Sequence, residues 1–188
     1  MVENQDFANK TDSELVKLTL KNQANFLYLV NRYEQKLFYF IRRISNVSVD
    51  EAKDLLQDVF IKVYQNLNDF DQSLKFSSWI YRIARNHVIS HYRKNRHQQA
   101  VASPEVNDEI LNNLVSDFDI TKEIDSKILR ENILSVLNKI DGKYREVIIL
   151  KYFEEKSYEE ISDIIKKPTG TVGTYLNRAK KQFKEKFK

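Results

Sequence analysis

Hydrophobic residues recur at three- and four-residue steps along most of this 188-residue chain, which is the spacing of helices with one buried face. Strand-like alternation and hairpin signals are scarce, and the chain contains 3 glycines and 2 prolines. The pattern therefore predicts an all-α protein. We expect two small helical domains, over residues 10–97 and 122–188, joined by a flexible acidic linker over residues 98–121.

The first predicted domain contains four helices. Thr11, Asp12 or Ser13 is expected to cap a short helix, and a break precedes a long second helix that runs to about Ile44. The second helix has an aromatic-rich apolar stripe, which is more typical of a packed core than of a ligand pocket. The stripe consists of Phe26, Leu29, Val30, Tyr33, Leu37, Phe40, Ile41 and Ile44.

The start of the third helix is predicted by a capping box at Ser48–Glu51, in which each side chain accepts a hydrogen bond from the other residue's backbone amide. A turn-rich loop, Asn68–Lys75, comes after this helix. The apolar positions of the third helix are Leu55, Leu56, Val59, Phe60, Val63 and Leu67.

The fourth helix is expected over Phe76–His97, with Ser77 or Ser78 as its cap. Its apolar stripe consists of Ile80, Ile83, Ala84 and Val88. Away from that stripe lie the cations and aromatic residues Arg82, Arg85, Arg93, Lys94, Arg96, Trp79, Tyr81 and Tyr92. Cations neutralise phosphates and aromatic faces stack on unpaired bases, so this mixture favours a nucleic-acid surface. A solvated basic helix face is an equally good explanation of this helix taken alone.

The composition changes between Gln98 and Thr121, where acidic residues accompany Pro104 and no lysine or arginine occurs before Lys122. This composition and length favour a mobile linker over an ordinary surface loop.

The second predicted domain also contains four helices. Asp141-Gly142 separates the first from the second, and a second capping box at Ser157–Glu160 opens the third. Residues Lys166–Thr169 turn the chain into the fourth, whose inner stripe is Val172, Leu176, Ala179, Phe183 and Phe187. Two helices joined by a short turn, the second of them basic, are typical of a helix-turn-helix, although a helical hairpin without DNA-binding function has the same pattern.

Composition narrows the possible chemistry. The chain has no cysteine, so disulfides and thiolate metal sites are excluded. His87, His91 and His97 lack partners at metal-ligand spacing and are assigned to packing or phosphate contact. We find no phosphate-binding loop, nucleophile elbow or zinc pattern, and therefore expect no cofactor, no metal and no catalytic activity. The start of the chain lacks a signal-peptide core and no stretch is apolar enough to span a membrane, which predicts a cytoplasmic protein without membrane insertion.

Two segments, DEAKDLLQDVFIKVYQNL and YREVIILKYFEEKSYEEISDIIKKPTGTVGTYLNRAKKQF, resemble two parts of the bacterial extracytoplasmic-function (ECF) sigma factors. The resemblance runs from Thr11 to about Phe187, with the segments in the family's order. It implies that the first domain is sigma region 2 and the second is sigma region 4. It further implies a protein that binds core RNA polymerase, reads minus-thirty-five and minus-ten promoter elements and helps melt the latter.

The resemblance also implies where the polymerase binds. Asp54, Gln57 and Asp58 match family residues that dock on the coiled coil of the polymerase β′ subunit. Without the resemblance, a solvated helix face is the commonest explanation of these residues. A metal site or an acid–base pair is disfavoured because no histidine or further ligand joins them.

For the minus-ten element, the resemblance implies that the loop after the third helix forms a pocket for one flipped base, and that the next helix contacts DNA around it. The residues concerned are Lys62, Phe70, Asp71, Gln72, Ser73, Lys75, Arg82 and Asn86. Asn86 can offer the paired donor and acceptor that adenine requires.

For the minus-thirty-five element, the last helix offers a phosphate site at its start and outward side chains for the major groove. The residues are Thr169, Gly170, Thr171, Thr174, Tyr175, Asn177 and Arg178. The chain departs from the family at Gly173, where relatives usually have lysine or arginine, and at Lys166-Lys167, where they tend to have Gly-Ile. These departures put the upstream base preference in doubt.

The partners implied are core RNA polymerase (through the β′ coiled coil and the β subunit), promoter DNA and an anti-sigma factor. Two other functions are compatible with the pattern of helices. One is a helix-turn-helix regulator that acts without polymerase, and the other is a helical adaptor whose basic faces bind acidic proteins.

Overall fold

A computed structural model describes residue 7 and residues 9–45, 47–94 and 126–187. The predicted linker, together with Arg96 and His97, lies outside the described residues. Every regular element in these described ranges is a helix, which confirms the all-α prediction. The chain divides into two compact units, Met1–Ala100 and Val101–Lys188. None of the described helices has the length and apolar content needed to cross a bilayer.

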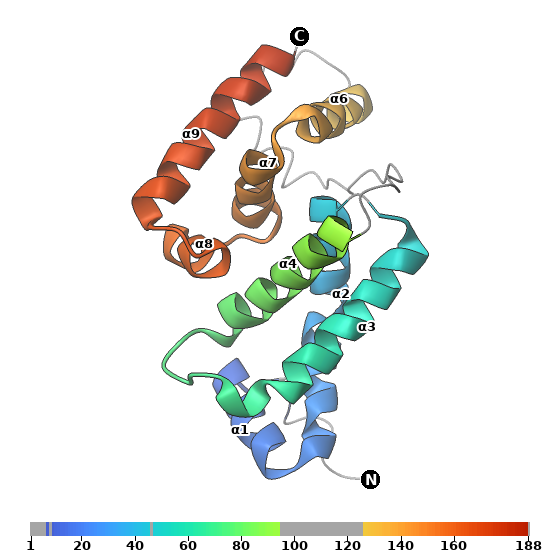
Figure 1. Cartoon of the computed structure of the whole chain (residues 1–188), viewed down its shortest axis with the longest axis vertical. Coiled ribbons are helices and arrows are strands. Elements are labelled where there is room, and N and C mark those ends of the chain that lie inside the picture. Colours follow the sequence, from blue (N-terminus) through green and yellow to red (C-terminus); the bar gives the residue numbers. More distant parts are fainter. Residues whose placement is uncertain (1–6, 8, 46, 95–125, 188) are drawn as a thin grey trace. The chain divides into compact units, whose positions relative to one another are not determined.

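The N-terminal unit is a bundle in which α2, α3 and α4 pack on one another and α1 packs on α2 (Figure 1). Its α-helices are α1 (Asp12–Lys21), α2 (Phe26–Ser45), α3 (Val49–Gln65) and α4 (Phe76–Lys94). Two short 3₁₀ helices complete it, η1 (Gln23–Asn25) and η2 (Leu67–Asp69). The predicted break between the first two helices is therefore a C-cap followed by one 3₁₀ turn.

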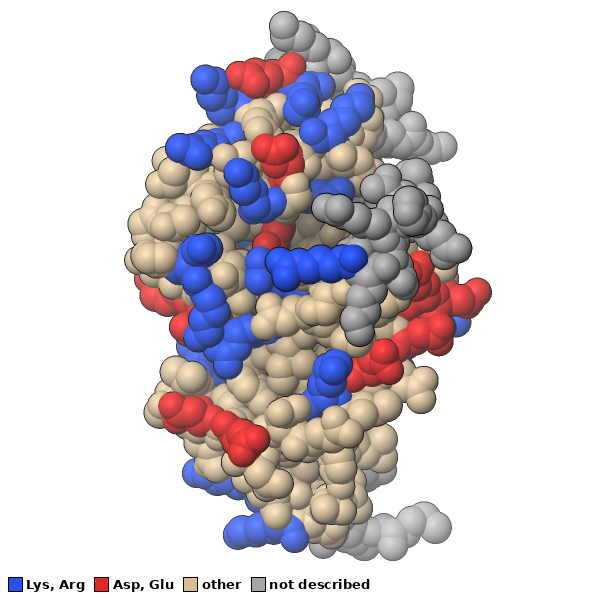
Figure 2. Space-filling model, viewed as in Figure 1, with Lys and Arg blue, Asp and Glu red and all other residues tan. Residues whose placement is uncertain are grey.

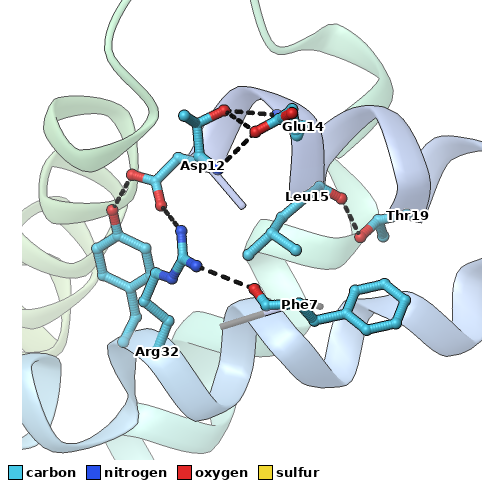
Figure 3. A network of polar contacts seen from close by, with 8 residues as sticks. Phe7, Asp12, Glu14, Leu15, Thr19 and Arg32 are labelled. Carbon is cyan, nitrogen blue, oxygen red and sulfur yellow. Dashed lines mark hydrogen bonds and ion pairs between the residues drawn. The ribbon is translucent and has the colours of Figure 1, made fainter. Parts of the chain in front are cut away.

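Polar contacts cap helix α1 and bind its start to α2 (Figure 3). Of the three candidate caps, Thr11 is the N-cap, and it forms a full capping box with Glu14. Asp12 accepts a hydrogen bond from Arg32 Nη1 at 2.8 Å and another from the Tyr33 hydroxyl. Arg32 Nη2 also donates to the Phe7 carbonyl at 3.4 Å. These bonds tie the start of α1 to the middle of α2.

Two cap predictions in this unit need correction. Ser48 accepts from the Glu51 amide at 3.2 Å, but the Glu51 carboxylate lies 3.7 Å from His91 Nδ1 on α4, so only the serine half of that capping box forms. Helix α4 begins at Phe76, with the Trp79 amide donating to the Lys75 carbonyl. The two serines therefore lie inside the first turn, and the Ser78 hydroxyl is buried without a hydrogen-bond partner.

In the N-terminal unit, α4 buries residues outside its predicted apolar stripe as well as within it. The predicted stripes of α2, α3 and α4 supply most of the core of this unit, as the period-3.6 pattern requires. However, Trp79 and Tyr81, which we expected on the outer face, are only 8% and 1% exposed. Tyr81 packs on Phe40, with ring centroids 4.9 Å apart. The expected position of both rings on the outer face is wrong, and Tyr81 is too deeply buried to stack on a base.

The C-terminal unit places α9 against α6, α7 and α8 (Figure 1). Its helices are α6 (Ser126–Lys139), α7 (Gly142–Ile148), the π-helix η3 (Ile149–Phe153), α8 (Tyr158–Ile165) and α9 (Thr169–Lys186). The π-helix was not predicted. Four consecutive residues that run from the end of α7 into the π-helix, Val147–Leu150, are each at most 1% exposed, so this segment is buried on more than one side.

The turn between α8 and α9 agrees with the sequence pattern. Ser157 and Glu160 form the predicted capping box in both directions, with donor–acceptor distances of 3.2 and 2.9 Å. Lys166 ends α8 in the left-handed conformation, with φ 54°. Pro168 is the N-cap of α9, which begins at Thr169, the last residue of the predicted turn. Lys166 therefore adopts a left-handed backbone conformation, which glycine adopts with less strain.

Candidate nucleic-acid interface

A hollow of about 420 Å³ lies on the N-terminal unit where the end of α3, η2 and one face of α4 meet. Lys62 from α3 and Arg82 and Asn86 from α4 all line it, so the fold brings these three predicted DNA-contacting residues together. The complete lining is Lys62, Asn66, Asp69, Trp79, Arg82, Ile83, Asn86, His87 and Ser90.

The hollow combines an apolar part with a cationic rim. Trp79 and Ile83 contribute apolar surface, Lys62 and Arg82 contribute positive charge, and Asp69 is the one acidic residue in the lining. Asn86 is exposed and accepts from Arg85 Nη1 at 3.4 Å. This surface can neutralise a phosphate and offer an amide to a base edge.

The loop next to the hollow has its own internal hydrogen bonds. Asp71 accepts from the Ser73 amide at 2.9 Å, and hydrogen bonds from Ser73 lower the pKa of Asp71 because they stabilise the carboxylate. Asp71, Gln72, Ser73 and Lys75 are exposed, as a base-binding loop requires.

Phe70 differs from the other loop residues because it is 6% exposed. Its ring packs against Phe76 and Trp79, with centroids 5.5 and 5.0 Å away. A direct stacking contact of Phe70 with a base does not fit this burial. In this structure the ring anchors the loop to the first turn of α4.

The predicted docking face on α3 is exposed at all three positions, Asp54, Gln57 and Asp58. Figure 2 shows acidic side chains gathered over α3. The acidic residues in the sequence of α3 are Asp50, Glu51, Asp54 and Asp58. Asp58 is not isolated, since its Oδ2 lies 3.2 Å from Nε2 of His87 on α4.

His87 therefore touches both surfaces, because it contacts Asp58 and also lines the hollow. Burial lowers the pKa of His87, and nearby Lys62 and His91 act in the same direction, against the opposing effect of Asp58. The histidines were assigned to packing or to phosphate contact, and His87 fits the first of these, because it packs against Asp58. Among the described residues, no group of three or more His, Cys, Asp or Glu side chains is arranged to hold a metal ion.

Helix α9 presents the predicted upstream-reading residues on its surface. Five of them, Thr169, Gly170, Thr174, Asn177 and Arg178, are exposed, whereas Thr171 and Tyr175 are half-buried. Thr174 Oγ1 donates to the Gly170 carbonyl at 2.9 Å, which uses its proton within the helix. The basic residues of α9 are Arg178, Lys180, Lys181, Lys184 and Lys186, against the single acid Glu185. Figure 2 shows lysine and arginine side chains spread over this unit.

The comparisons with known proteins match both units. The family model for Sigma-70 region 2 matches residues 29–98, and the model for Sigma-70, region 4 matches residues 130–183. The ECF RNA polymerase sigma factor SigW of Bacillus subtilis is 33% identical over 171 residues, covering 89% of this chain and 91% of that protein. The chain belongs to the ECF sigma factors. It is therefore a sigma factor that binds RNA polymerase and directs promoter-specific transcription, and the two other functions considered above are set aside.

Other relatives align with nearly the whole length of the sigma factor. The ECF RNA polymerase sigma-E factor of Escherichia coli K12 is 29% identical over 181 residues, which is 94% of each chain. Among solved structures, CnrH in complex with the cytosolic domain of CnrY aligns with a TM-score of 0.66 at 23% identity, covering 93% of this chain and 95% of that one. The sigma factor RpoE of Bartonella quintana, solved with the anti-sigma factor NepR, aligns with a TM-score of 0.65 at 22% identity, covering 86% and 96%. These two structures support the fold of the sigma factor.

Several residues of the hollow escaped the sequence analysis. Asn66 and Ser90 line it but were not assigned to DNA contact. Asp69 belongs to the predicted loop Asn68–Lys75 but was not named individually, and His87 was assigned to packing or phosphate contact. Two of them lie four residues after predicted ones, Asn66 after Lys62 and Ser90 after Asn86, so helical spacing was a usable signal. That Asp69 and His87 line the same hollow depends on how η2 and α3 pack against α4.

Proposed function

We propose that the sigma factor divides its work among three surfaces. The face of α3 formed by Asp54, Gln57 and Asp58 docks on the β′ coiled coil of core polymerase. The hollow and its adjoining loop bind the minus-ten element and hold one flipped base, and α9 binds the major groove of the minus-thirty-five element. Residues 10–97 then act as region 2 and residues 122–188 as region 4, connected by residues 98–121.

The observation that carries this proposal is the meeting of Lys62, Arg82 and Asn86 in one hollow beside the exposed loop. Flipping a base costs a few kcal/mol of unstacking, which contacts to the extruded base and its phosphates must offset. The hollow supplies cations for phosphates, and Asn86 supplies an amide edge. In our proposal Phe70 holds the loop in place and does not itself contact the base.

The docking role is supported by exposure and charge. Asp54 and Asp58 are four residues apart on one helix and Gln57 lies between them, so the three side chains form one polar face. A coiled-coil surface of complementary charge would meet two carboxylates and an amide there. Contact of the sigma factor with the β subunit is part of the same proposal.

The upstream role is supported by the helix-turn-helix and by the charge of α9. Arg178 is an exposed arginine that can make a bidentate contact with guanine, while Asn177 can contact adenine. Thr169, Gly170 and Thr171 open the helix where a phosphate is favoured, since backbone amides point outward there.

We further propose that the sigma factor catalyses no reaction itself and acts in the cytoplasm, where core polymerase transcribes. An anti-sigma factor is a proposed partner, because two similar folds have been solved with CnrY and with the anti-sigma factor NepR bound.

The test is transcription in vitro with core polymerase and two series of promoters, each altered at one element. Arg178→Ala should reduce the response to base changes at the minus-thirty-five element. Asn86→Ala should reduce the response at the minus-ten element and slow open-complex formation. Each well-placed bidentate contact is worth about 1–3 kcal/mol of discrimination.

Matched controls are Lys181→Ala on α9 and Asn31→Ala on α2, both exposed positions outside the proposed readers. Lys181→Ala should weaken binding evenly across promoters, as loss of a phosphate contact does. Asn31→Ala should leave both elements and the rate of opening unchanged. The division of labour is wrong if Arg178→Ala and Asn86→Ala alter the same promoters to the same extent.

A further inference from the structure

Tyr144, near the start of α7, contacts two of the α9 residues assigned to the major groove. Its hydroxyl accepts a hydrogen bond from Arg178 Nη1 at 3.3 Å. Its ring meets the ring of Tyr175 edge-on, with centroids 5.5 Å apart and planes at 80°. Tyr144 itself is only 5% exposed, so it offers little surface of its own.

These two contacts restrain side chains on the surface of α9. Arg178 is exposed there and Tyr175 is half-buried. A long arginine side chain loses rotamer freedom when it binds a base, and a restraint present before binding reduces that loss. One hydrogen bond to Nη1 leaves the other guanidinium N–H groups available for a bidentate contact.

The surrounding contacts fix the helix on which this arrangement depends. One turn after Arg178, Gln182 Nε2 donates to the Asp141 carboxylate at 3.2 Å, and Gln182 Oε1 accepts from the Asp141 amide at 3.3 Å. These bonds hold α9 at a fixed position along the start of α7. Lys143 Nζ lies 4.9 Å from the centroid of the Tyr144 ring.

We propose that Tyr144 is a positioning residue for promoter recognition. Its hydroxyl orients Arg178 and its ring orients Tyr175, so Tyr144 sets the base preference at the minus-thirty-five element without touching DNA. The proposal rests on the proposed reading roles of Arg178 and Tyr175. It goes beyond them because it assigns specificity to a buried residue on a different helix.

A purely structural role makes different predictions. If Tyr144 only fills space between α7 and α9, removing its hydroxyl would lower stability or weaken all promoters alike. If it positions the readers, removing the hydroxyl changes the ranking of promoters. The selectivity among promoters, and not the total activity, therefore distinguishes the positioning role from the structural role.

The experiment uses the full-length sigma factor with core polymerase and promoters that share one minus-ten element but differ by single bases upstream. Tyr144→Phe removes the hydroxyl and keeps the ring, so selectivity at the base read by Arg178 should fall about three- to tenfold. Selectivity at the base nearest Tyr175 should persist. Tyr144→Leu removes both contacts, and selectivity should fall at both bases.

Tyr152→Phe is the matched control, because it removes a hydroxyl from another buried tyrosine of the same unit. Its promoter ranking should stay unchanged. The positioning role is overturned if Tyr144→Phe keeps the original ranking, or weakens every promoter equally, while Arg178→Ala alters the ranking. If Arg178→Ala itself leaves upstream selectivity intact, the reading role of α9 residues fails instead. Should Tyr144→Leu not fold, the Tyr144→Phe result decides.

Discussion

The two units hold their proposed DNA-binding side chains in different ways. In the N-terminal unit the hollow is lined from two helices, and the adjoining loop is anchored by Phe70 in an aromatic cluster with Phe76 and Trp79. In the C-terminal unit a single helix carries the readers, and the buried Tyr144 contacts two of them.

This difference matches two kinds of recognition. Capturing a base outside the duplex requires a pocket whose shape exists beforehand, because unstacking the base is already unfavourable. Reading an intact major groove requires side chains that project from a helix and adapt to base edges. A core-anchored loop suits the first task, and a lightly restrained helix surface suits the second.

The largest effect expected from this comparison is on the anchored loop. Phe70→Ala should destabilise the N-terminal unit by about 3 kcal/mol, because it empties space beside two other rings. The chain's single tryptophan, Trp79, lies against Phe70, so its fluorescence during urea unfolding reports this unit alone.

Tyr175→Ala is the counterpart in the C-terminal unit. Tyr175 is half-buried and its ring meets that of Tyr144, so its loss should cost less than about 1.5 kcal/mol, measured by amide hydrogen exchange along α9. Similar losses of stability in both variants would contradict the contrast between the two units.

The next effect concerns docking on polymerase. Asp58→Lys should weaken core binding by more than about tenfold, since it reverses a charge on the proposed docking face. Fluorescence anisotropy of a labelled sigma factor titrated with core polymerase gives the affinity. Glu34→Lys, an equal charge reversal at an exposed position of α2, should bind core normally. Normal affinity of a folded Asp58→Lys variant would exclude Asp58 from the contact.

A smaller effect is expected at two positions where the chain departs from its family, one in the turn before α9 and one inside α9. Gly173→Ala should stabilise the C-terminal unit by about 1 kcal/mol, because helix propensity rises and the new methyl meets only Tyr158, at 4.0 Å. Lys166→Gly should add about 0.5 kcal/mol by relieving the left-handed backbone, partly offset by a more flexible unfolded chain. Thermal unfolding followed by circular dichroism measures both, and destabilisation by Gly173→Ala would show that this glycine is required for packing.

The smallest effect is a pH dependence at His87. Its ordinary pKa is 6.5 and the folded value is lower. Above that ordinary pKa both folded and unfolded chains hold a neutral imidazole, so the residue has no effect on stability. As the pH falls below it, the unfolded chain binds the proton first, and the N-terminal unit loses stability until folded His87 is also protonated.

His87→Gln removes this titration and keeps a donor for Asp58. The decrease in Tm between about pH 7.5 and about pH 5.5 should therefore be smaller in the variant than in the natural chain. An unchanged decrease would place the responsible group elsewhere in the chain.

Helical period predicted most of this fold because it reports which side of each helix avoids water. Most of the predicted stripe residues of α2, α3, α4 and α9 are buried, and the Ser157–Glu160 box marked the start of α8. The spacing of hydrophobic residues does not indicate how many other elements pack around a helix. Trp79 and Tyr81 were therefore expected outside, although contacts from α2 and from the loop cover them.

The surfaces were predictable only in part. Family motifs named Lys62, Arg82 and Asn86, but their meeting in one hollow depends on the packing of α3 against α4. The contacts of His87 with Asp58 and of Tyr144 with Arg178 join residues 29 and 34 positions apart. Local sequence spacing carries no information about such pairs.

The π-helix Ile149–Phe153 makes the orientation of the helix-turn-helix sensitive to chain length. Its wider turn accommodates one residue more than an α-helical turn, and its residues Ile149, Leu150, Tyr152 and Phe153 are buried. Removing one residue from this stretch would favour a continuous α-helix and rotate the rest of the unit by about 100° around the helix axis. Helices α8 and α9 would then leave the turn in another direction, with every side chain of α9 chemically unchanged. A single-residue deletion well before α9 is therefore expected to change how the proposed reading helix meets the promoter.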